Sequence, residues 1–151
     1  MIVTFDTNVL VYATAPAHTV KAERARDLIA RGMRAPACLL LLQTLAEFAN
    51  VAIGKASMSA GNVRAIIEAW RAVLPVHPAE PDDLPAALDA VKAHRLAFWD
   101  AMLWAAARRL GVRYFLTEDM QDGFALDGVR FLNPFIWAND DLIEEILPSS
   151  G

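Results

Sequence analysis

The stretch that decides the fold is IVTFDTN, residues 2–8. Its first four residues form a short apolar and β-branched run without polar alternation, which is typical of a strand buried on both faces of a parallel sheet. The run ends at Asp6, and open α/β sheets bind their ligands beyond the carboxyl ends of the strands. The segment therefore predicts a buried strand at residues 2–5 and a candidate functional carboxylate directly after it.

A second strand is predicted late in the chain, at residues 112–116 (VRYFL), and is followed at once by Thr117, Glu118 and Asp119. Parallel strands joined through helices end at the same edge of their sheet. We therefore expect the two strands to run parallel and adjacent, and the carboxylates of Asp6 and Asp119 to lie close together. Glu118 is expected to face solvent.

Helical and strand patterns alternate through the rest of the chain. Helices are predicted at residues 19–31, 41–54, 59–73, 82–94 and 98–111, and short strands at 36–39 and 129–132. The proline-rich stretch 75–85 indicates a strand-to-helix loop, because the segments beside it are too short for two separate cores. This alternation predicts an α/β fold with right-handed crossovers. One domain is expected over residues 1–138, followed by an acidic C-terminal helix and tail at 139–151.

The composition restricts the class of protein. With 151 residues, 56% of them hydrophobic and 21% charged, the chain fits one globular domain, and no apolar run is long enough for a membrane helix. Asp6 and Asn8 interrupt the apolar start before it reaches the length of a signal peptide core. Cys38 is the only cysteine, which excludes an internal disulfide and favours a reducing cytoplasm. The three histidines are too far apart in sequence to indicate a zinc cluster.

The net charge of −4 argues at first against nucleic acid as a partner. The chain has 18 acidic and 14 basic side chains. If four of the acids hold metal ions, the bound cations reverse the local sign, and the remaining acidic and basic side chains balance. The composition therefore leaves a nucleic-acid substrate open.

Four carboxylates stand in apolar surroundings: Asp6 after the first strand, Glu47 in LLQTLAEF, Asp100 in LAFWDAMLW and Asp119 in YFLTEDM. An ionised acid is costly to bury among apolar side chains. A hydrogen bond or an arginine partner explains any single one equally well, but four together indicate a set of oxygen ligands. Such ligands suit Mg²⁺ or Mn²⁺, and a pair of these ions activates water and stabilises the transition state of phosphodiester hydrolysis.

The surroundings of two of these acids leave alternatives. Gln43, Glu47 and Asn50 share one helix face, which is either a polar stripe directed into the site or the solvated side of a surface helix. Asp100 lies near a helix start, where the helix dipole alone stabilises an anion, although Trp99 beside it argues against full exposure. Four large side chains of this helix are predicted to be core residues rather than a base-stacking platform: Phe98, Trp99, Met102 and Trp104.

Five motifs, in this order, resemble PIN domains and especially the VapC-like toxins of type II toxin-antitoxin modules. They are DTNVLVY (6–12), AEF (46–48), FWDAMLWAAA (98–107), FLTEDMQDG (115–123) and NPF (133–135). The resemblance implies a three-layer α/β/α sandwich around a central, mainly parallel sheet. It also implies a ribonuclease that needs Mg²⁺ or Mn²⁺, with Asp6, Glu47, Asp100 and Asp119 as its catalytic metal ligands.

The same resemblance implies supporting roles around these ligands. Asn8 and Thr117 would orient them through hydrogen bonds, and Asp122 would do so more weakly. From the residues alone, Asn8 equally well caps a turn or the start of a following helix, and Gln121-Asp122-Gly123 is typical of a simple turn. The family likeness further implies an RNA substrate, a homodimer and a cognate antitoxin as a protein partner.

Two other functions compete with that of an RNA-cleaving toxin. One is a PIN-fold module that binds RNA or acts as a scaffold without catalysis, although a scaffold has no need of four intact acids. The other is a phosphoaspartyl enzyme of the haloacid dehalogenase type, whose pattern has a second aspartate where this chain has Asn8. Metal-dependent phosphodiesterase activity separates the first function from the other two.

Overall fold

Helices and strands alternate through the computed structural model, which describes residues 1–149. The strands are β1 (Ile2–Phe5), β2 (Leu40–Leu41), β3 (Val76–His77), β4 (Val112–Leu116), β5 (Ala125–Leu126) and β6 (Val129–Leu132). The helices are α1 (Thr7–Thr14), α2 (Val20–Arg34), α3 (Leu42–Gly54), α4 (Ala60–Arg71), α5 (Asp83–His94), α6 (Phe98–Arg109) and α7 (Asp140–Ile146), with the 3₁₀ turn η1 (Trp137–Asn139) before α7. Within the described range, no helix combines the length and the apolar character needed to cross a membrane.

The central sheet has the strand order β1-β4-β6-β5, in which β1, β4 and β6 are parallel and the short β5 is antiparallel. Phe5 of β1 lies opposite Leu116 of β4, so the predicted pairing of these two strands is confirmed. A second parallel pair, β2 and β3, adjoins the other edge of β1 through a bridge between Val3 and Cys38. The parallel strands β1 and β4 therefore end side by side at one edge of the sheet.

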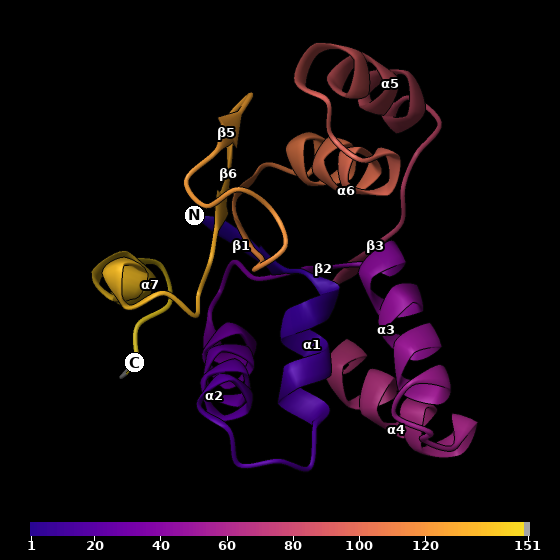
Figure 1. Cartoon of the computed structure of the whole chain (residues 1–151), viewed down its shortest axis with the longest axis vertical. Coiled ribbons are helices and arrows are strands. Elements are labelled where there is room, and N and C mark those ends of the chain that lie inside the picture. Colours follow the sequence, from indigo (N-terminus) through magenta and orange to yellow (C-terminus); the bar gives the residue numbers. More distant parts are fainter. Residues whose placement is uncertain (150–151) are drawn as a thin grey trace.

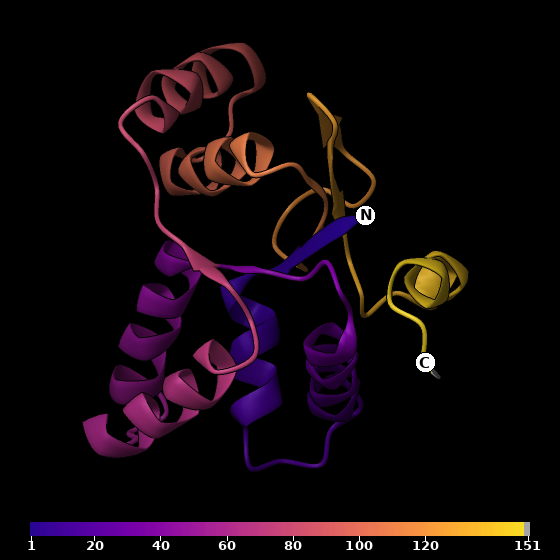
Figure 2. The same cartoon turned by 180° about the vertical axis from the view of Figure 1, so that it is seen from behind.

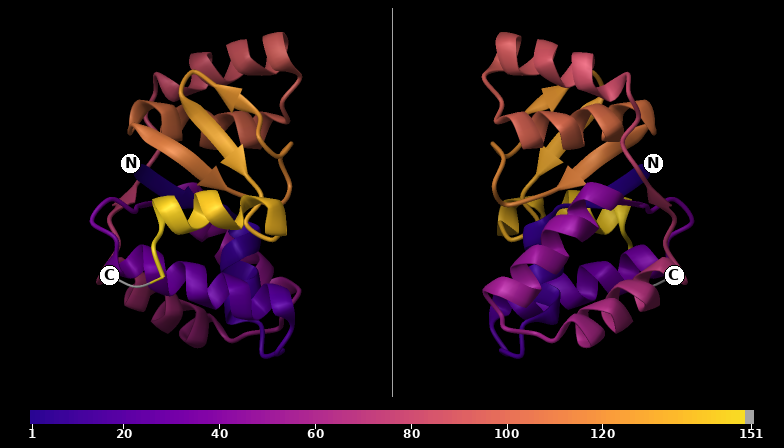
Figure 3. Two further views of the ribbon diagram at one scale, coloured as in Figure 1. Left: turned by 90° about the vertical axis from the view of Figure 1, so that its left-hand side faces the viewer. Right: turned by 90° about the vertical axis from the view of Figure 1, so that its right-hand side faces the viewer.

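Helices cover both faces of this sheet (Figure 1). On one face lie α5 and α6, whose buried side chains pack with residues of β4 and β6. On the other face lie α1 to α4 and α7, which form a second core cluster with β1 and the ends of β4 and β6. The view from behind shows the same two helical layers (Figure 2), and the side views show strands between them (Figure 3). The predicted three-layer α/β/α sandwich with a central, mainly parallel sheet is therefore confirmed.

Helix α1 begins at Thr7, directly after Asp6, which follows the end of β1. Asp6 has extended backbone angles, and its Oδ1 accepts a hydrogen bond of 2.7 Å from the backbone N–H of Thr7, which makes Asp6 the N-cap. Val9 and Leu10 are buried against the neighbouring helices α2 and α3. The sequence does not predict the extent of α1, because its β-branched residues have low helix propensity and tertiary packing decides its conformation.

The prediction of a second strand at residues 36–39 is wrong in its position. The structure forms β2 at Leu40–Leu41, and Cys38 contributes only the bridge to Val3. Pro36 has no N–H to donate to a strand ladder. β2 pairs instead with β3, which lies inside the stretch 75–85 that the sequence predicts as a loop. Two-residue strands are fixed by their distant partners, and a local pattern does not contain that information.

The predicted acidic C-terminal helix is α7, which packs on the same face as α2. Ile143, Ile146 and Leu147 are buried in the core cluster that includes β1. At the surface, Nη1 of Arg31 lies 2.9 Å from Oε2 of Glu144. The domain boundary at residue 138 stays a prediction, and residues 150–151 of the predicted tail lie outside the described part of the chain.

A buried ion pair joins the start of α5 to the end of α6. Asp83 is 3% exposed, and its two carboxylate oxygens accept hydrogen bonds from Nε (2.9 Å) and Nη2 (3.1 Å) of Arg109. The backbone N–H of Glu80 donates to Oδ2 of Asp83 at 2.8 Å. Burial alone would raise the pKa of Asp83, but the hydrogen bonds from Arg109 and Glu80 hold that pKa below its usual value. The pair therefore stabilises the ionised carboxylate inside the fold.

Candidate active site

The four predicted acids line one pocket of about 500 Å³ at the carboxyl edge of β1 and β4. Asp6 follows β1, Glu47 lies on α3, Asp100 lies in the first turn of α6, and Asp119 follows β4. The pairing of the two strands thus brings Asp6 and Asp119 to the same pocket, as expected. The other lining residues are Thr7, Asn8, Val11, Tyr12, Asn50, Val51 and Lys55.

Asp6 is the most enclosed of the four acids, with 6% of its surface exposed. Its Oδ1 caps α1, and its Oδ2 accepts a hydrogen bond of 2.7 Å from Oγ1 of Thr117. Burial raises the pKa of Asp6 to about 6, against the hydrogen bonds from Thr117 and Thr7 that lower it, and the charges of Asp100 and Asp119 add to the rise. Asp6 therefore holds a proton more tightly than an ordinary aspartate, in a place where a cation would favour the ionised form.

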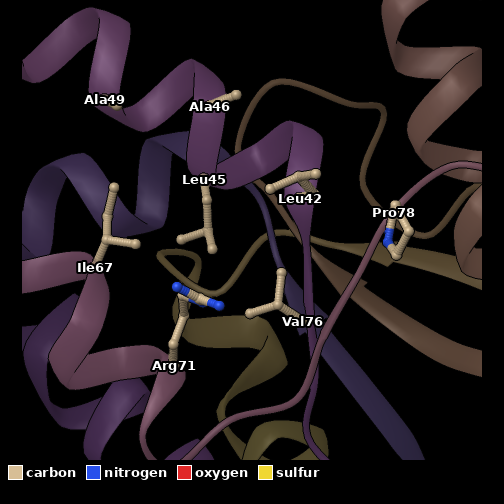
Figure 4. A pocket seen from close by; sticks show the side chains of 8 residues that line it. All are labelled: Leu42, Leu45, Ala46, Ala49, Ile67, Arg71, Val76 and Pro78. Carbon is tan, nitrogen blue, oxygen red and sulfur yellow. The ribbon is translucent and has the colours of Figure 1, made fainter. Parts of the chain in front are cut away.

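Glu47 is oriented by two hydrogen bonds. Oγ1 of Thr7 donates to its Oε2 at 3.0 Å, and Nε2 of Gln43 donates to its Oε1 at 2.8 Å. Asn50, on the same face of α3, also lines the pocket. The polar stripe of α3 is therefore directed into the site. Another side of α3 borders a separate apolar groove between α3 and α4, with a volume of about 490 Å³ (Figure 4).

Asp119 lies at the exposed rim of the pocket, and Asn8 orients its carboxylate. Nδ2 of Asn8 donates to Oδ2 of Asp119 at 3.0 Å and to Oγ1 of Thr117 at 3.3 Å. Thr117 Oγ1 also accepts a hydrogen bond of 3.1 Å from the backbone N–H of Asp119. Asn8 and Thr117 thus link the carboxylates of Asp6 and Asp119. Oδ1 of Asn8 is buried and has no hydrogen-bond partner among residues 1–149.

Asp100 is the acid whose charge is least compensated. Burial raises the pKa of Asp100, and the charges of Asp119 and Glu47 raise it further. Within residues 1–149 no hydrogen bond to its carboxylate offsets these effects. Asp100 lies in the first turn of α6, where the helix dipole stabilises an anion. At an exposed site this stabilisation is about 0.3 to 1 kcal/mol. Among the described residues, the start of its own helix is thus the only feature that favours the ionised form of Asp100.

The chemistry of the pocket fits a hydrated divalent ion rather than a closed metal cage. Within the described residues, no three acidic, histidine or cysteine side chains converge closely enough to enclose an ion. Mg²⁺ keeps several waters and is bound by one or two carboxylates, so it does not require a closed cage. The carboxylates and the unpartnered Oδ1 of Asn8 are hard oxygen donors, and the described lining contains no sulphur or imidazole. Such a donor set suits Mg²⁺ or Mn²⁺.

Two residues beside the site differ from the expectations of sequence. Glu118 does not face solvent, because it accepts hydrogen bonds from the hydroxyl of Tyr12 and from Nζ of Lys21. Burial would raise the pKa of Glu118, but the hydrogen bonds from Lys21 and Tyr12 lower it. Trp99, predicted as a core residue, is 62% exposed, whereas Trp104 is buried as predicted. Long-range contacts decide both positions, and no local signal in the sequence identifies them.

Asp122 is not among the residues that line the pocket. Its Oδ1 accepts hydrogen bonds from the backbone N–H of Asn133 (2.8 Å) and from Nδ2 of Asn139 (2.9 Å). These bonds tie the turn after β4 to the segment that follows β6. Asp122 thus stabilises a turn, as its motif predicts, and the supporting role that the resemblance implies stays a prediction.

Residues 3–124 match the family model described as PIN domain. The chain belongs to the PIN domain family. The matched range begins in β1 and extends past β4, so it includes all four acids of the pocket. The family assignment made from the five sequence motifs is confirmed.

Two solved structures share the fold of this PIN domain. One is VapC20 of Mycobacterium tuberculosis, described as a sarcin-ricin loop cleaving toxin, with 20% sequence identity and a TM-score of 0.64 over 78% of this chain and 91% of that chain. The other is a toxin-antitoxin complex from Klebsiella pneumoniae, with 19% identity and a TM-score of 0.65 over 87% of this chain and 97% of that chain. At these identities the likeness establishes the fold. Comparison with curated proteins gave no match.

Proposed function

We propose that this PIN domain is a divalent-metal-dependent ribonuclease and the toxin of a toxin-antitoxin pair. The observation that carries the proposal is a single pocket lined by Asp6, Glu47, Asp100 and Asp119, in which burial and mutual repulsion raise the pKa of Asp6 and Asp100. Carboxylates crowded in this way oppose folding, so a function explains them better than stability does. The fold likeness to VapC20, which is named for cleaving the sarcin-ricin loop, supports a nuclease.

The four acids are the proposed ligands of Mg²⁺ or Mn²⁺. Such an ion, when bound, supplies an activated water for attack on phosphorus and neutralises charge on the phosphate. The chain's own residues hold the ligand oxygens in place before substrate arrives. Thr7 and Thr117 donate to Asp6, Thr7 and Gln43 donate to Glu47, and Asn8 donates to Asp119.

The purified protein is expected to cleave a labelled RNA with Mg²⁺ or Mn²⁺ and to be inactive with EDTA, because the four acids alone supply no charge that stabilises a phosphate. Gel analysis of an end-labelled RNA measures this, with single-stranded DNA as a second substrate. A Glu47→Gln protein, prepared in parallel, controls for contaminating nucleases. Cleavage that persists in EDTA would contradict the proposal. RNA binding without cleavage under any metal would favour the non-catalytic PIN module.

We further propose that the protein acts in the cytoplasm as a homodimer and binds a cognate antitoxin. The toxin-antitoxin complex of similar fold supports a protein partner, and the apolar groove between α3 and α4, where Leu42 is exposed, offers a surface for a peptide. Light scattering at dilute concentration is expected to give the mass of a dimer. The product of a small neighbouring reading frame is expected to co-purify and to suppress cleavage. A monomeric protein that does not bind such a product would contradict both expectations.

A further inference from the structure

We propose that bound RNA lies along the pocket-facing side of α3, with an unpaired base stacked on Trp99 and a phosphate bound by Lys55. The inference rests on the proposed nuclease function. It assigns substrate contacts to two residues that are not candidate metal ligands, one at each end of the polar stripe of α3.

Trp99 presents an aromatic surface beside the site. Its side chain is 62% exposed, and it directly precedes Asp100, which lines the pocket. Its ring contacts Phe98 edge to face, with the ring centroids 5.0 Å apart and the planes at 66°. Single exposed hydrophobic residues are common on protein surfaces, so exposure alone does not mark a function. The second observation is how Trp99 is attached to the site.

The backbone of Trp99 is tied to a candidate metal ligand through one side chain. Nε2 of Gln43 donates to the carbonyl oxygen of Trp99 at 3.1 Å and to Oε1 of Glu47 at 2.8 Å. The start of α6 is thereby held against the start of α3 in a fixed relation to the four acids. This hydrogen bond fixes the backbone of Trp99, and so the point from which its exposed ring extends, before the substrate binds. Its neighbours Gln43 and Asp100 are polar, which fits a nucleotide better than an apolar protein surface.

Lys55 is the basic residue at the other end of the stripe. It lies at the C-cap of α3 and lines the pocket of the four acids. None of the ion pairs among the described residues includes Lys55, although four acids share its pocket. A lysine that lines an acidic pocket but stands apart from the acids is available to a phosphate. Lysine binds phosphate as a point charge and requires no particular geometry.

The spacing of the stripe matches an extended strand of nucleic acid. Gln43 and Lys55 are separated along α3 by about 18 Å, at 1.5 Å per residue, and Glu47 and Asn50 lie between them. Proteins that bind single strands combine aromatic rings, on which bases stack, with cations along the backbone. Both contacts tolerate any base. A base within a duplex is already stacked on its neighbours, so the arrangement selects unpaired RNA over double-stranded RNA.

Binding of a fluorescein-labelled single strand of roughly 12 nucleotides tests the proposal, with Ca²⁺ as the ion and the same sequence as a duplex for comparison. We expect Trp99→Ala to raise the Kd for the single strand by about 5- to 100-fold, since stacking contributes roughly 1 to 3 kcal/mol per base. Trp99→Phe is expected to restore most of the affinity. Lys55→Ala is expected to lower the slope of log Kd against log salt by about 0.7, the value for one phosphate contact, and Lys55→Arg to restore it.

Trp137 supplies a matched control, because it is 84% exposed and lines a separate pocket beside Val20 and Phe135, with no hydrogen bond among the described residues that ties it to the acids. Trp137→Ala is expected to bind the single strand as the parent does. Thermal unfolding of every variant shows whether the fold is retained, and Trp99→Phe separates the loss of the ring from a change in fold. Cleavage with Mn²⁺ adds an independent readout: Trp99→Ala is expected to raise KM more than it lowers kcat, since the ring contacts substrate away from the reacting phosphate.

The outcomes separate this inference from the function on which it rests. If the parent neither binds nor cleaves RNA, the proposed function fails. If the parent cleaves RNA and Trp99→Ala and Lys55→Ala do so with the parent's KM, the inference fails and the proposed function stands. Equal affinity for single strand and duplex would also overturn it. The inference would also be overturned if Trp99→Ala lost binding to a co-purifying protein partner and kept the parent's affinity for RNA. Trp99 would then be part of a protein interface.

Discussion

An Asp100→Asn variant is expected to lose metal-dependent RNA cleavage by about 100-fold or more while its metal-free fold stays as stable as the parent or becomes more stable. Removal of a residue that only orients a metal ligand costs 10- to 100-fold, so loss of a ligand should cost at least as much. The pKa of Asp100 is raised by burial and by the charges of Asp119 and Glu47. Neutralising it removes that repulsion and the cost of burying the charge, which act against the favourable helix dipole.

Thermal unfolding with and without Mn²⁺, alongside cleavage of a labelled RNA, measures both halves of this expectation. A bound ion stabilises the parent by mass action, by about 2.7 kcal/mol when its concentration is 100 times the dissociation constant. The variant is expected to gain less. Asp89→Asn makes the same chemical change on the exposed surface of α5 and should behave as the parent does. Parental cleavage by Asp100→Asn, or parental stabilisation by Mn²⁺, would refute the role of Asp100 as a ligand.

The metal-free part of this experiment depends on pH through Asp6, whose pKa rises from 3.8 to about 6 in the folded protein. Below pH 3.8 both the folded and the unfolded chain carry the proton, and the contribution of Asp6 to stability is fully present. Above that value the unfolded chain releases the proton first. Stability is therefore lost as the pH rises towards about 6, by roughly 3 kcal/mol in total. Mn²⁺ should restore much of this loss.

An Asp83→Ala variant is expected to lose about 1.5 to 3 kcal/mol of unfolding free energy, because it removes the buried carboxylate that accepts hydrogen bonds from Arg109. Glu80 and the carbonyl oxygen of Pro78 nevertheless remain as partners of the guanidinium. The buried carboxylate of Asp83 accepts two hydrogen bonds from Arg109 and one from Glu80, which together hold α5 against α6. Its pKa is lowered, so its contribution is present above the unfolded value of 3.8 and is lost as the pH falls below it. Urea unfolding at neutral pH, with the slope of the transition unchanged, measures the effect.

The adjacent Asp82→Ala supplies the control for Asp83, because Asp82 is exposed and its side chain does not cap α5. It is expected to change stability by less than about 0.5 kcal/mol. Arg109→Lys should be intermediate in magnitude, since an ammonium group cannot form the two parallel hydrogen bonds of a guanidinium. A loss below about 1 kcal/mol in Asp83→Ala would show that the pair behaves as an ordinary surface ion pair.

The strands that carry the site could be predicted from sequence because their signals are local. An apolar, β-branched run ends at Asp6 and a mostly apolar run ends at Thr117, and the rule for parallel sheets then places Asp6 close to Asp119. The polar face of α3 is also a local pattern, although its periodicity does not decide whether it meets solvent or the site. The hydrogen bonds of Glu47 to Thr7 and Gln43 decide that question.

The side-chain positions that the sequence did not predict depend on residues far away in the sequence. Asp83 looks like an ordinary first-turn acid until Arg109 is placed against it. Glu118 lies between two residues of the site, and only the packing of α1 and α2 brings Tyr12 and Lys21 to its carboxylate. Trp99 has the spacing of a core residue, yet its side chain is 62% exposed. In each case the local pattern of the sequence does not identify the distant residues that decide where the side chain lies.

The pairing of β1 with β4 also sets when the pocket forms during synthesis. Thr117 donates to Asp6 across 111 residues of sequence, and β4 supplies the neighbour on one edge of β1. A nascent chain that has not yet emerged as far as Val112 leaves that edge of β1 unpaired, with backbone groups open to other strands. Asp100 and Asp119 are translated after most of the helices that surround the pocket. The four acids can therefore come together only after α1 to α6 have been synthesised.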